Sequence, residues 1–177
     1  MEIPFLTNDS ESMRSVLFIR HAKSNWDDRA LSDFDRPLSD RGKKDAPEMA
    51  SRLINRKILL DSFISSPAKR ARKTADFFID AYGSPKGNLL LKAELYLPST
   101  DVFYDVIEGI DDRFRHLALF SHNPGITHFV NQLTREITID HMPTCSIFAI
   151  KTDLSHWADF RKAPKQFWFL DYPKKPA

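Results

Sequence analysis

Two histidines of this chain follow runs of apolar residues that are typical of buried strands. Residues 16–19 run into Arg20-His21, and residues 117–120 run into Ser121-His122. A guanidinium beside an imidazole suits a phosphoryl group, because arginine offers a bidentate pair of hydrogen-bond donors and histidine a nitrogen nucleophile. The alternative for Arg20-His21 alone is a strand that ends in two solvated polar residues. The chemistry therefore depends on the elements that bring such residues together.

Both histidines are predicted at the carboxyl ends of strands, where open α/β sheets bind their ligands. Arg70 lies near the start of a predicted helix that follows another strand. Because parallel strands bring such junctions to one edge of a sheet, we expect the two histidines and their arginines to lie close together. A helix N-terminus adds unpaired N–H groups and a partial positive charge, which also favour a phosphate dianion. The sequence thus predicts an anion-binding pocket that holds two imidazoles.

Strand and helix patterns alternate along the chain. The predicted strands cover 16–19, 59–65, 89–91, 116–120, 145–151 and 166–170, the last as an edge strand, and the predicted helices cover 40–56, 67–81, 99–110 and 124–133. Ser39 and Ser66 are predicted N-caps. Pro47 predicts either a kink in the first helix or a start near Asp45. The alternation indicates a three-layer α/β/α sandwich with a mostly parallel central sheet.

A length of 177 residues, 42% of them hydrophobic, indicates one domain with a sizeable core. We predict a flexible N-terminal tail over residues 1–13 and a single domain over residues 14–177. The tail lacks the cationic start and apolar stretch of a signal peptide, and no apolar run approaches the ~20 residues that span a bilayer. A cytoplasmic protein without a membrane partner is therefore expected. The one cysteine, Cys145, excludes an internal disulfide and is expected inside a strand.

Four motifs resemble the histidine phosphatase superfamily (phosphoglycerate mutase-like), and within it the branch of the SixA phosphohistidine phosphatases. In chain order they are Arg20-His21-Ala22, Arg36-Pro37-Leu38-Ser39-Asp40-Arg41-Gly42, Ser66-Pro67-Ala68-Lys69-Arg70-Ala71-Arg72-Lys73-Thr74 and Ser121-His122-Asn123-Pro124-Gly125. The segment Pro143-Thr144-Cys145 also looks like that branch. Each motif is weak alone, but four in the expected order form a specific pattern. The resemblance spans residues 16 to about 150 and implies a phosphoglycerate mutase-like fold.

By this resemblance His21 is a nucleophile that forms a phosphohistidine intermediate, and Arg20, Arg70 and His122 hold the phosphoryl oxygens. A histidine nucleophile has to be neutral, so we expect its other ring nitrogen to donate to a backbone carbonyl or a similar group. The arginines favour this neutral form and replace a metal ion. The remaining histidines show no zinc-binding spacing. The resemblance therefore implies an enzyme without a metal or other cofactor.

Arg36 is a candidate additional contact to the phosphate, because the family places this Arg-Pro-Leu segment over the site. The alternative for Arg36 is an ion pair with Asp33 or Asp35. Ser24 and Asn25 are candidate contacts as well, since they follow the nucleophile closely in the sequence.

Glu94 is the candidate general acid. Larger members of the superfamily use a Glu or Asp to protonate the leaving oxygen, and Glu94 follows the third predicted strand. The alternative is a solvated loop carboxylate. SixA-like enzymes manage without a dedicated carboxylic acid, which fits an imidazole leaving group. Monoester hydrolysis demands accelerations up to ~10²¹-fold, so weak acid catalysis favours phosphoramidates instead.

The predicted function is a metal-independent phosphatase that acts on phosphohistidine of a protein, such as a histidine phosphotransfer domain. The segment between Arg70 and His122 leaves no room for a large cap, so an open pocket is expected. The alternative is a phosphomonoesterase of small esters such as sugar phosphates or nucleotides. A remote alternative is a non-catalytic module that binds nucleic acid or phosphate through Lys69, Arg70, Arg72 and Lys73. A net charge of +2 and the lack of a nucleic-acid motif weigh against it.

Overall fold

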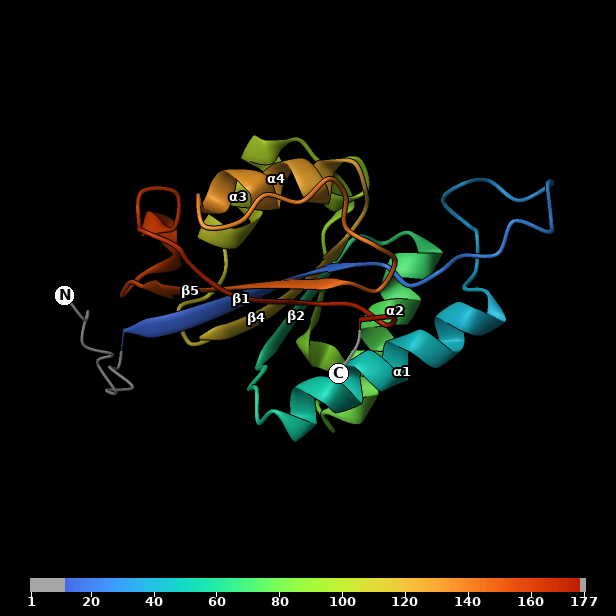
Figure 1. Cartoon of the computed structure of the whole chain (residues 1–177), viewed down its shortest axis with the longest axis horizontal. Helices are drawn as coiled ribbons and strands as arrows, with labels where there is room; N and C mark the ends of the chain where they lie inside the picture. The colour runs from blue at the N-terminus through green and yellow to red at the C-terminus, as the bar shows by residue number, and fades with distance from the viewer. Residues whose placement is uncertain (1–11, 176–177) are drawn as a thin grey trace.

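A six-stranded mixed sheet forms the middle layer of residues 12–175, the part of the chain that the computed structural model describes (Figure 1). Its strands lie in the order β3, β2, β4, β1, β5 and β6. They comprise β1 (Met13–Arg20), β2 (Ser62–Ser65), β3 (Leu89–Leu91), β4 (His116–Ser121), β5 (Ile147–Asp153) and β6 (Gln166–Asp171). The first four are parallel to one another, whereas β5 is antiparallel to β1 and to the edge strand β6.

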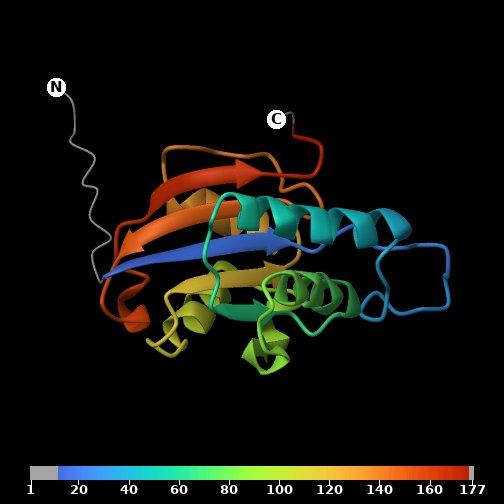
Figure 2. The same cartoon turned by 90° about the horizontal axis from the view of Figure 1, so that it is seen from below.

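Two α-helices cover each face of this sheet within the described residues. α1 (Asp40–Asn55) and α2 (Lys69–Ala81) lie on one face, and α3 (Thr100–Glu108) and α4 (Gly125–Leu133) lie on the other (Figure 1, Figure 2). The fold predicted from the sequence, a three-layer sandwich with a mostly parallel sheet, is confirmed. Short 3₁₀ turns at Lys86–Asn88, Ala93–Leu95 and Trp157–Asp159 lie in the connections.

The strand β1 is buried on both of its faces. Val16 and Phe18 belong to the core under α3 and α4, and Leu17 and Ile19 to the core under α1 and α2. All four side chains are fully buried, which explains why the strand is a continuous apolar run in the sequence rather than an alternating one. The last residue of β1 pairs with the last residue of β4. The segments that follow these two strands therefore start side by side.

The helix α1 begins at Asp40, as its predicted cap requires. The Oγ of Ser39 accepts the N–H of Gly42 at 3.2 Å, which confirms Ser39 as the N-cap. A start near Asp45, one of the two predictions made from Pro47, was wrong, because the helix continues through the proline. Proline leaves the carbonyl four residues earlier without its helical donor, but that turn is exposed, so water can hydrate the carbonyl.

The start of α2 differs from the prediction. The helix begins at Lys69 with Ala68 in the N-cap position, not at Pro67 with Ser66 as its cap. The Oγ of Ser66 instead accepts the N–H of Ala68 at 3.2 Å, in a turn that precedes the helix. The Ser66 hydroxyl therefore lies beside His122, which follows another strand. A local sequence pattern does not reveal this contact.

Cys145 is buried, but it lies before β5 and not inside a strand as expected. Its backbone is left-handed, with a φ of 60°. Its N–H donates to the carbonyl oxygens of both Arg20 and His21, each at 3.1 Å. This shared hydrogen bond fixes the end of β1, where the predicted nucleophile lies.

β1 begins at Met13, which the sequence assigned to the end of the tail. Residues 1–11 of that predicted tail lie outside the described residues. Between residues 12 and 175, no helix combines the length and the apolar character needed to cross a membrane.

The helix α1 is fastened to the segment that follows His21. The carbonyl oxygen of Lys23 accepts hydrogen bonds from the N–H of Ser39 at 2.9 Å and from its Oγ at 3.1 Å. A β-carbon on Gly42 would lie only 2.2 Å from the same oxygen. Gly42 therefore permits the close approach that positions this segment.

We expect Gly42→Ala to lower the free energy of unfolding by about 2 kcal/mol, because the backbone has to shift to admit the methyl group. Gly87→Ala is the control, since a β-carbon at Gly87 meets nothing within 4 Å. Urea unfolding followed by circular dichroism measures both variants. Equal stability of the two would contradict the close approach of α1 to Lys23.

Candidate active site

The ends of β1 and β4 and the first turn of α2 meet at one edge of the sheet. His21 follows β1, His122 follows β4, and Arg70 is the second residue of α2. These side chains line a pocket of about 300 Å³ together with Arg20 and Arg36. The ring centroids of the two histidines are 5.0 Å apart. The structure thus brings the predicted nucleophile together with its predicted phosphoryl ligands.

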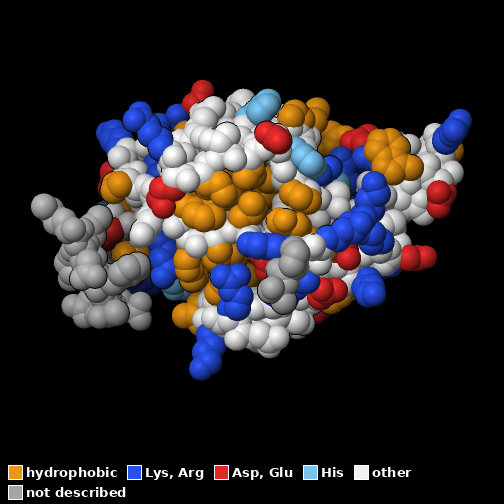
Figure 3. Space-filling view, in the orientation of Figure 1, with side chains coloured by type: hydrophobic (Ala, Val, Ile, Leu, Met, Phe, Trp, Pro, Cys, Tyr) orange, Lys and Arg blue, Asp and Glu red, His pale blue; other side chains and the backbone are white. Residues whose placement is uncertain are grey.

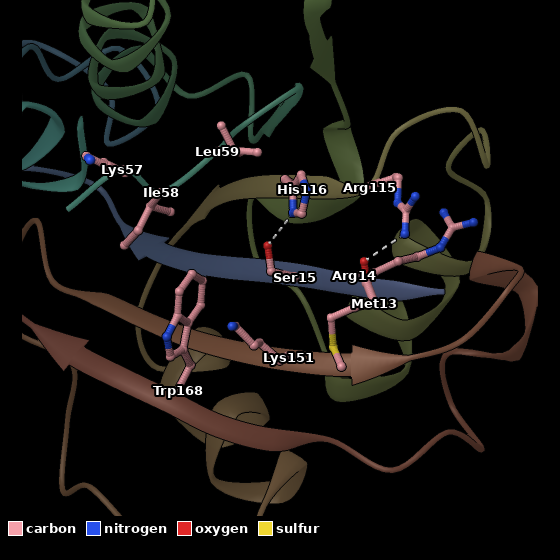
Figure 4. Close-up of a pocket in the computed structure, with 10 residues that line it drawn as sticks. All are labelled: Met13, Arg14, Ser15, Lys57, Ile58, Leu59, Arg115, His116, Lys151 and Trp168. Atoms are coloured by element: carbon pink, nitrogen blue, oxygen red, sulfur yellow. Dashed lines mark hydrogen bonds between the residues drawn. The ribbon is translucent and has the colours of Figure 1, made fainter. Parts of the chain in front are cut away.

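A larger pocket of about 450 Å³ lies at the opposite, amino-terminal ends of the strands (Figure 4). Its walls include Lys57, Lys151 and Trp168, but none of the residues predicted to carry out chemistry. The guanidinium of Arg14 beside it is held by backbone carbonyl groups. We therefore place the candidate chemistry in the smaller pocket.

His21 is held as a neutral imidazole. Its Nδ1 lies 2.7 Å from the carbonyl oxygen of Ala22, which can only accept, so Nδ1 carries the proton and Nε2 keeps its lone pair. Arg70 Nε donates to this Nε2 at 3.2 Å. Burial, and to a lesser degree the charges of Arg70 and Arg20, hold the pKa of His21 well below its ordinary value. Its Nε2 is therefore a nitrogen able to attack phosphorus at neutral pH.

His122 is a second buried, neutral imidazole. Its Nε2 lies 2.8 Å from Oγ of Ser66, and its ring meets that of Tyr96 edge to face at a centroid distance of 5.5 Å. Burial, followed by the charge of Arg70, lowers the pKa of His122 to about 3. Its Nδ1 is buried, and no group within residues 12–175 forms a hydrogen bond with it. When the Ser66 hydroxyl donates to Nε2, Nδ1 carries a proton that a phosphoryl oxygen can accept.

Arg20 and Arg36 hold buried nitrogen donors that have no partner among the described residues. Arg20 Nη1 donates to the carbonyl of Met142 at 2.7 Å, while its Nε is unpaired. Arg36 Nη2 donates to Asp33 at 2.6 Å, while its Nε and Nη1 are unpaired. The ion pair with Asp33, the alternative for Arg36, is therefore present, and Arg36 also lines the pocket, where a contact to phosphate stays a prediction. Unpaired buried donors are costly, and an anion would satisfy them.

Asp33 is the one acidic side chain in this pocket wall among the described residues, and the sequence analysis considered it only as a partner of Arg36. Its carboxylate also accepts from Arg70 Nη2 at 3.0 Å and from the hydroxyl of Tyr96 at 2.6 Å. Burial would raise its pKa, but the Tyr96 hydrogen bond and the charges of Arg70 and Arg36 lower the pKa to about 2. The ionised Asp33 thus occupies donors that phosphoryl oxygens would otherwise use.

The other predicted contacts divide between those inside and those outside the pocket. Ser24 is buried in its wall. Asn25 does not line the pocket, and its Oδ1 accepts the N–H of Asp27 at 2.7 Å. Glu94 is exposed in a 3₁₀ turn and also lies outside the pocket wall. The segment expected to supply a carboxylic acid instead supplies the phenol of Tyr96, which bonds to Asp33.

Asn123 and Thr144 also line the pocket, and the sequence analysis did not single them out. Asn123 Nδ2 donates to the carbonyl of Met142 at 3.0 Å, and its Oδ1 accepts the hydroxyl of Thr127 at 2.6 Å. The first bond holds the turn after β4 against the segment before β5, and the second joins this turn to α4. Asn123 and Thr144 both lie in segments that resemble the histidine phosphatase superfamily, so the sequence already indicated them.

The fold and the pocket together suit a protein that handles phosphoryl groups. A neutral histidine at the end of β1 faces a group of arginines at the edge of an α/β sheet, which is an arrangement suited to a phosphoryl group. Within residues 12–175, no group of three or more His, Cys, Asp or Glu side chains is arranged to hold a metal ion. The pocket thus offers an anion the hydrogen-bond donors of arginine and histidine side chains.

The comparison of sequences points to the same class. Residues 16–89 match the model of the histidine phosphatase superfamily, branch 1. An uncharacterized chloroplastic protein from Arabidopsis thaliana is 42% identical over 71 residues, which are 40% of this chain and 33% of that protein. The match therefore spans about a third of the length of this relative.

Solved structures share the fold over nearly the whole chain. The protein histidine phosphatase SixA in complex with tungstate has a TM-score of 0.76 and 21% identity, over 90% of this chain and 97% of that one. A mycobacterial glucosyl-3-phosphoglycerate phosphatase has a TM-score of 0.62 and 16% identity, over 88% of this chain and 97% of that one. At these identities the likeness establishes the fold.

His122→Asn should make the stability of the protein less dependent on pH. A histidine with a pKa of about 3 when folded and 6.5 when unfolded contributes stability that is present above pH 6.5 and is lost as the pH falls towards 3. Between pH 7 and pH 5 this loss amounts to about 2 kcal/mol. In urea unfolding, the variant should therefore lose about 2 kcal/mol less than the wild type over this range.

The exposed His141 provides the control for that comparison, as His141→Asn. If His122→Asn and the wild type lose the same free energy of unfolding between pH 7 and pH 5, His122 is not a buried neutral base.

Asp33→Asn should tighten the binding of inorganic phosphate by about tenfold, because the substitution removes a carboxylate charge that competes with phosphate for Arg36 and Arg70. Asp35→Asn is the matched control: its carboxylate bonds to Ser32 at 2.6 Å and does not line the pocket. Isothermal titration calorimetry measures both affinities. Unchanged or weaker binding by Asp33→Asn would show that Asp33 does not compete with the anion.

Proposed function

We propose that this protein is a phosphatase that uses His21 as its nucleophile and passes through a phosphohistidine intermediate. The observation that carries the proposal is the tautomer of His21, whose Nδ1 donates to the Ala22 carbonyl while Nε2 faces Arg70. Nε2 attacks phosphorus, the bond to the leaving group breaks, and water then hydrolyses the phosphohistidine. Phosphoryl transfer depends on such alignment and on charge neutralisation more than on further covalent chemistry.

The roles of the surrounding groups follow from their hydrogen-bonding capacity. Arg20, Arg36 and Arg70 bring positive charge to the equatorial oxygens, and the unpaired nitrogens of the first two offer donors at once. His122 donates through Nδ1. Arg70 turns from His21 and Asp33 towards the phosphoryl group when the group displaces Asp33. The arginines supply the charge that a metal ion would otherwise supply, so the reaction should proceed with a chelator present.

The leaving group is inferred from the acids available at the pocket. Asp33 is ionised at neutral pH, since its pKa is about 2, and Glu94 lies outside the pocket wall. Neither is suited to protonate a leaving alkoxide. A phosphoramidate, whose imidazole departs far more readily, fits this site better than an ester. We therefore propose phosphohistidine on a protein as the substrate, in agreement with the fold shared with SixA.

Access to the pocket supports a macromolecular substrate. Between Arg70 and Ser121 the chain forms the rest of α2, β3, α3 and β4, without an inserted cap domain. Lys23, Trp26 and Leu97 line the pocket and are exposed. A phosphorylated side chain on another protein can therefore approach from solvent. A phosphotransfer domain in the cytoplasm is the partner that we propose.

Hydrolysis of small phosphate esters is the second candidate function. It is favoured by the same open access and by the fold shared with a glucosyl-3-phosphoglycerate phosphatase. The two functions use one site and differ in the leaving group. A comparison of the two substrate classes separates them.

The wild type should release phosphate from a phosphohistidine-bearing phosphotransfer protein faster than from p-nitrophenyl phosphate, with a chelator present. His21→Ala should lose at least about a thousandfold in kcat, because the nucleophile is gone. His141→Ala, which removes an exposed histidine, is the control. Phosphate release is measured for all three proteins on both substrates.

Turnover of the ester alone would establish a small-molecule phosphatase instead. Full activity of His21→Ala would overturn the proposed nucleophile. If neither substrate reacts with the wild type, the catalytic proposal fails.

A further inference from the structure

Exposed apolar side chains gather around the mouth of the active-site pocket. Of the seven large hydrophobic side chains that are exposed among the described residues, four belong to this region. We call them the apolar rim: Trp26, Leu31, Phe34 and Leu97. Trp26 is 66% exposed and Leu97 is 78% exposed. Single exposed apolar residues are ordinary, but a cluster at a site mouth indicates an interaction surface.

The contacts of the rim tie it to the phosphoryl site. Trp26 and Leu97 line the same pocket as His21. Leu31 shares an adjoining hollow with Trp26 and Asp33. The ring of Phe34 meets that of Tyr96 edge to face at 5.2 Å. Any molecule that delivers a phosphoryl group to His21 therefore passes this rim.

Positive charge borders the rim on the side of α2, whereas the segment 24–38 itself also exposes Asp27, Asp28 and Asp35. The backbone N–H of Lys69 donates to the carbonyl of Phe34 at 3.0 Å, which fixes the start of α2 beside the rim. Lys69, Arg72 and Lys73 are exposed on the first turns of this helix. Apolar and basic side chains lie side by side at the end of the molecule where the segment 24–38 projects (Figure 1, Figure 3). The basic cluster noted in the sequence thus divides, with Arg70 in the pocket and its neighbours on the surface.

We propose that the apolar rim and these cations form the docking surface for the phosphorylated protein substrate. The partner is a folded protein whose phosphohistidine projects from an apolar patch bordered by Asp and Glu. A small polar phosphate ester leaves Leu31 and Leu97 uncovered, whereas an apolar protein surface buries them. Acidic side chains around the patch face Lys69, Arg72 and Lys73. This inference rests on the proposed function and adds the surface that selects the substrate.

The test compares three Leu→Asp variants at exposed positions. Leu31→Asp and Leu97→Asp place a charge in the rim, and Leu59→Asp places one far from it, on a residue 66% exposed in the wall of the larger pocket. Trp26 is not used, because it stacks on Arg36 with the guanidinium carbon 3.4 Å from the ring centroid. The substrates are a phosphohistidine-bearing phosphotransfer protein and phosphoramidate, which offers the same P–N bond without a protein.

Each rim variant should raise KM for the phosphoprotein by about tenfold or more, with kcat within about twofold of the wild type. The kinetics of Leu31→Asp on phosphoramidate should be unchanged, which also shows that this variant is folded. Leu97→Asp places its charge in the pocket wall, so its KM for the phosphoprotein is compared with its own KM for phosphoramidate and should rise more than that value. Leu59→Asp should match the wild type on both substrates. Raised ionic strength should increase KM for the phosphoprotein only, because it screens the bordering cations.

Three outcomes would overturn the docking surface. Unchanged KM for the phosphoprotein in both rim variants rejects it while the proposed function stands. Salt-sensitive binding of a DNA or RNA oligonucleotide that Lys73→Glu abolishes, with KM for the phosphoprotein unaltered, assigns the surface to nucleic acid. A wild type that hydrolyses neither P–N substrate defeats the proposed function itself, and this inference falls with it.

Discussion

The hydrogen bond from His21 Nδ1 to the Ala22 carbonyl is the contact on which the site depends. It selects the tautomer in which Nε2 keeps its lone pair, and burial keeps that nitrogen unprotonated by lowering the pKa of the ring. The N–H of Ala22 is itself bonded to Oγ1 of Thr74, and that hydroxyl donates to the carbonyl of Arg70. This chain of bonds joins the backbone segment that orients the imidazole to the backbone of Arg70.

The same arrangement concentrates positive charge on buried side chains of the pocket. Burial, followed by the nearby charge of Arg70, lowers the pKa of Arg20, which reflects the cost of holding the two guanidinium groups together. The carboxylate of Asp33 offsets the positive charge of Arg70 and Arg36 but forms no ion pair with Arg20 among the described residues. The pocket therefore carries one carboxylate of its own and still retains unpaired donors on both Arg20 and Arg36. A phosphoryl dianion would satisfy these donors and offset the positive charge of the arginines.

The sequence predicted the residues whose position depends on local structure. Arg20, His21 and His122 follow directly from strands, and Arg70 from the start of a helix, so periodicity alone places them at one edge of the sheet. The bond from Ser66 to His122 and the bond from Cys145 to the end of β1 join residues far apart in the chain, and no pattern signals such tertiary contacts. Asp33 illustrates the same limit, because its spacing from Arg36 suggested an ion pair while its contact with Tyr96 depends on the fold. Glu94 had the right place in the chain order, but its short turn directs Tyr96 to the site instead.

The segment between Ser24 and Leu38 joins recognition to chemistry. The segment carries Trp26 at the pocket mouth, and the guanidinium of Arg36 stacks on its indole ring. The segment also carries Asp33, whose carboxylate pairs with Arg36 and Arg70. A phosphoryl group that displaces Asp33 would break its ion pair with Arg70, one of the contacts between this segment and α2, and would thus link anion binding to the position of the rim. A substrate that also covers the rim can offset the free energy lost in that displacement, whereas a small ester cannot. Under the proposed function, and with no proton donor suited to an alkoxide among the described residues of the pocket, selectivity would depend on how readily the leaving group departs and on the surface that presents it.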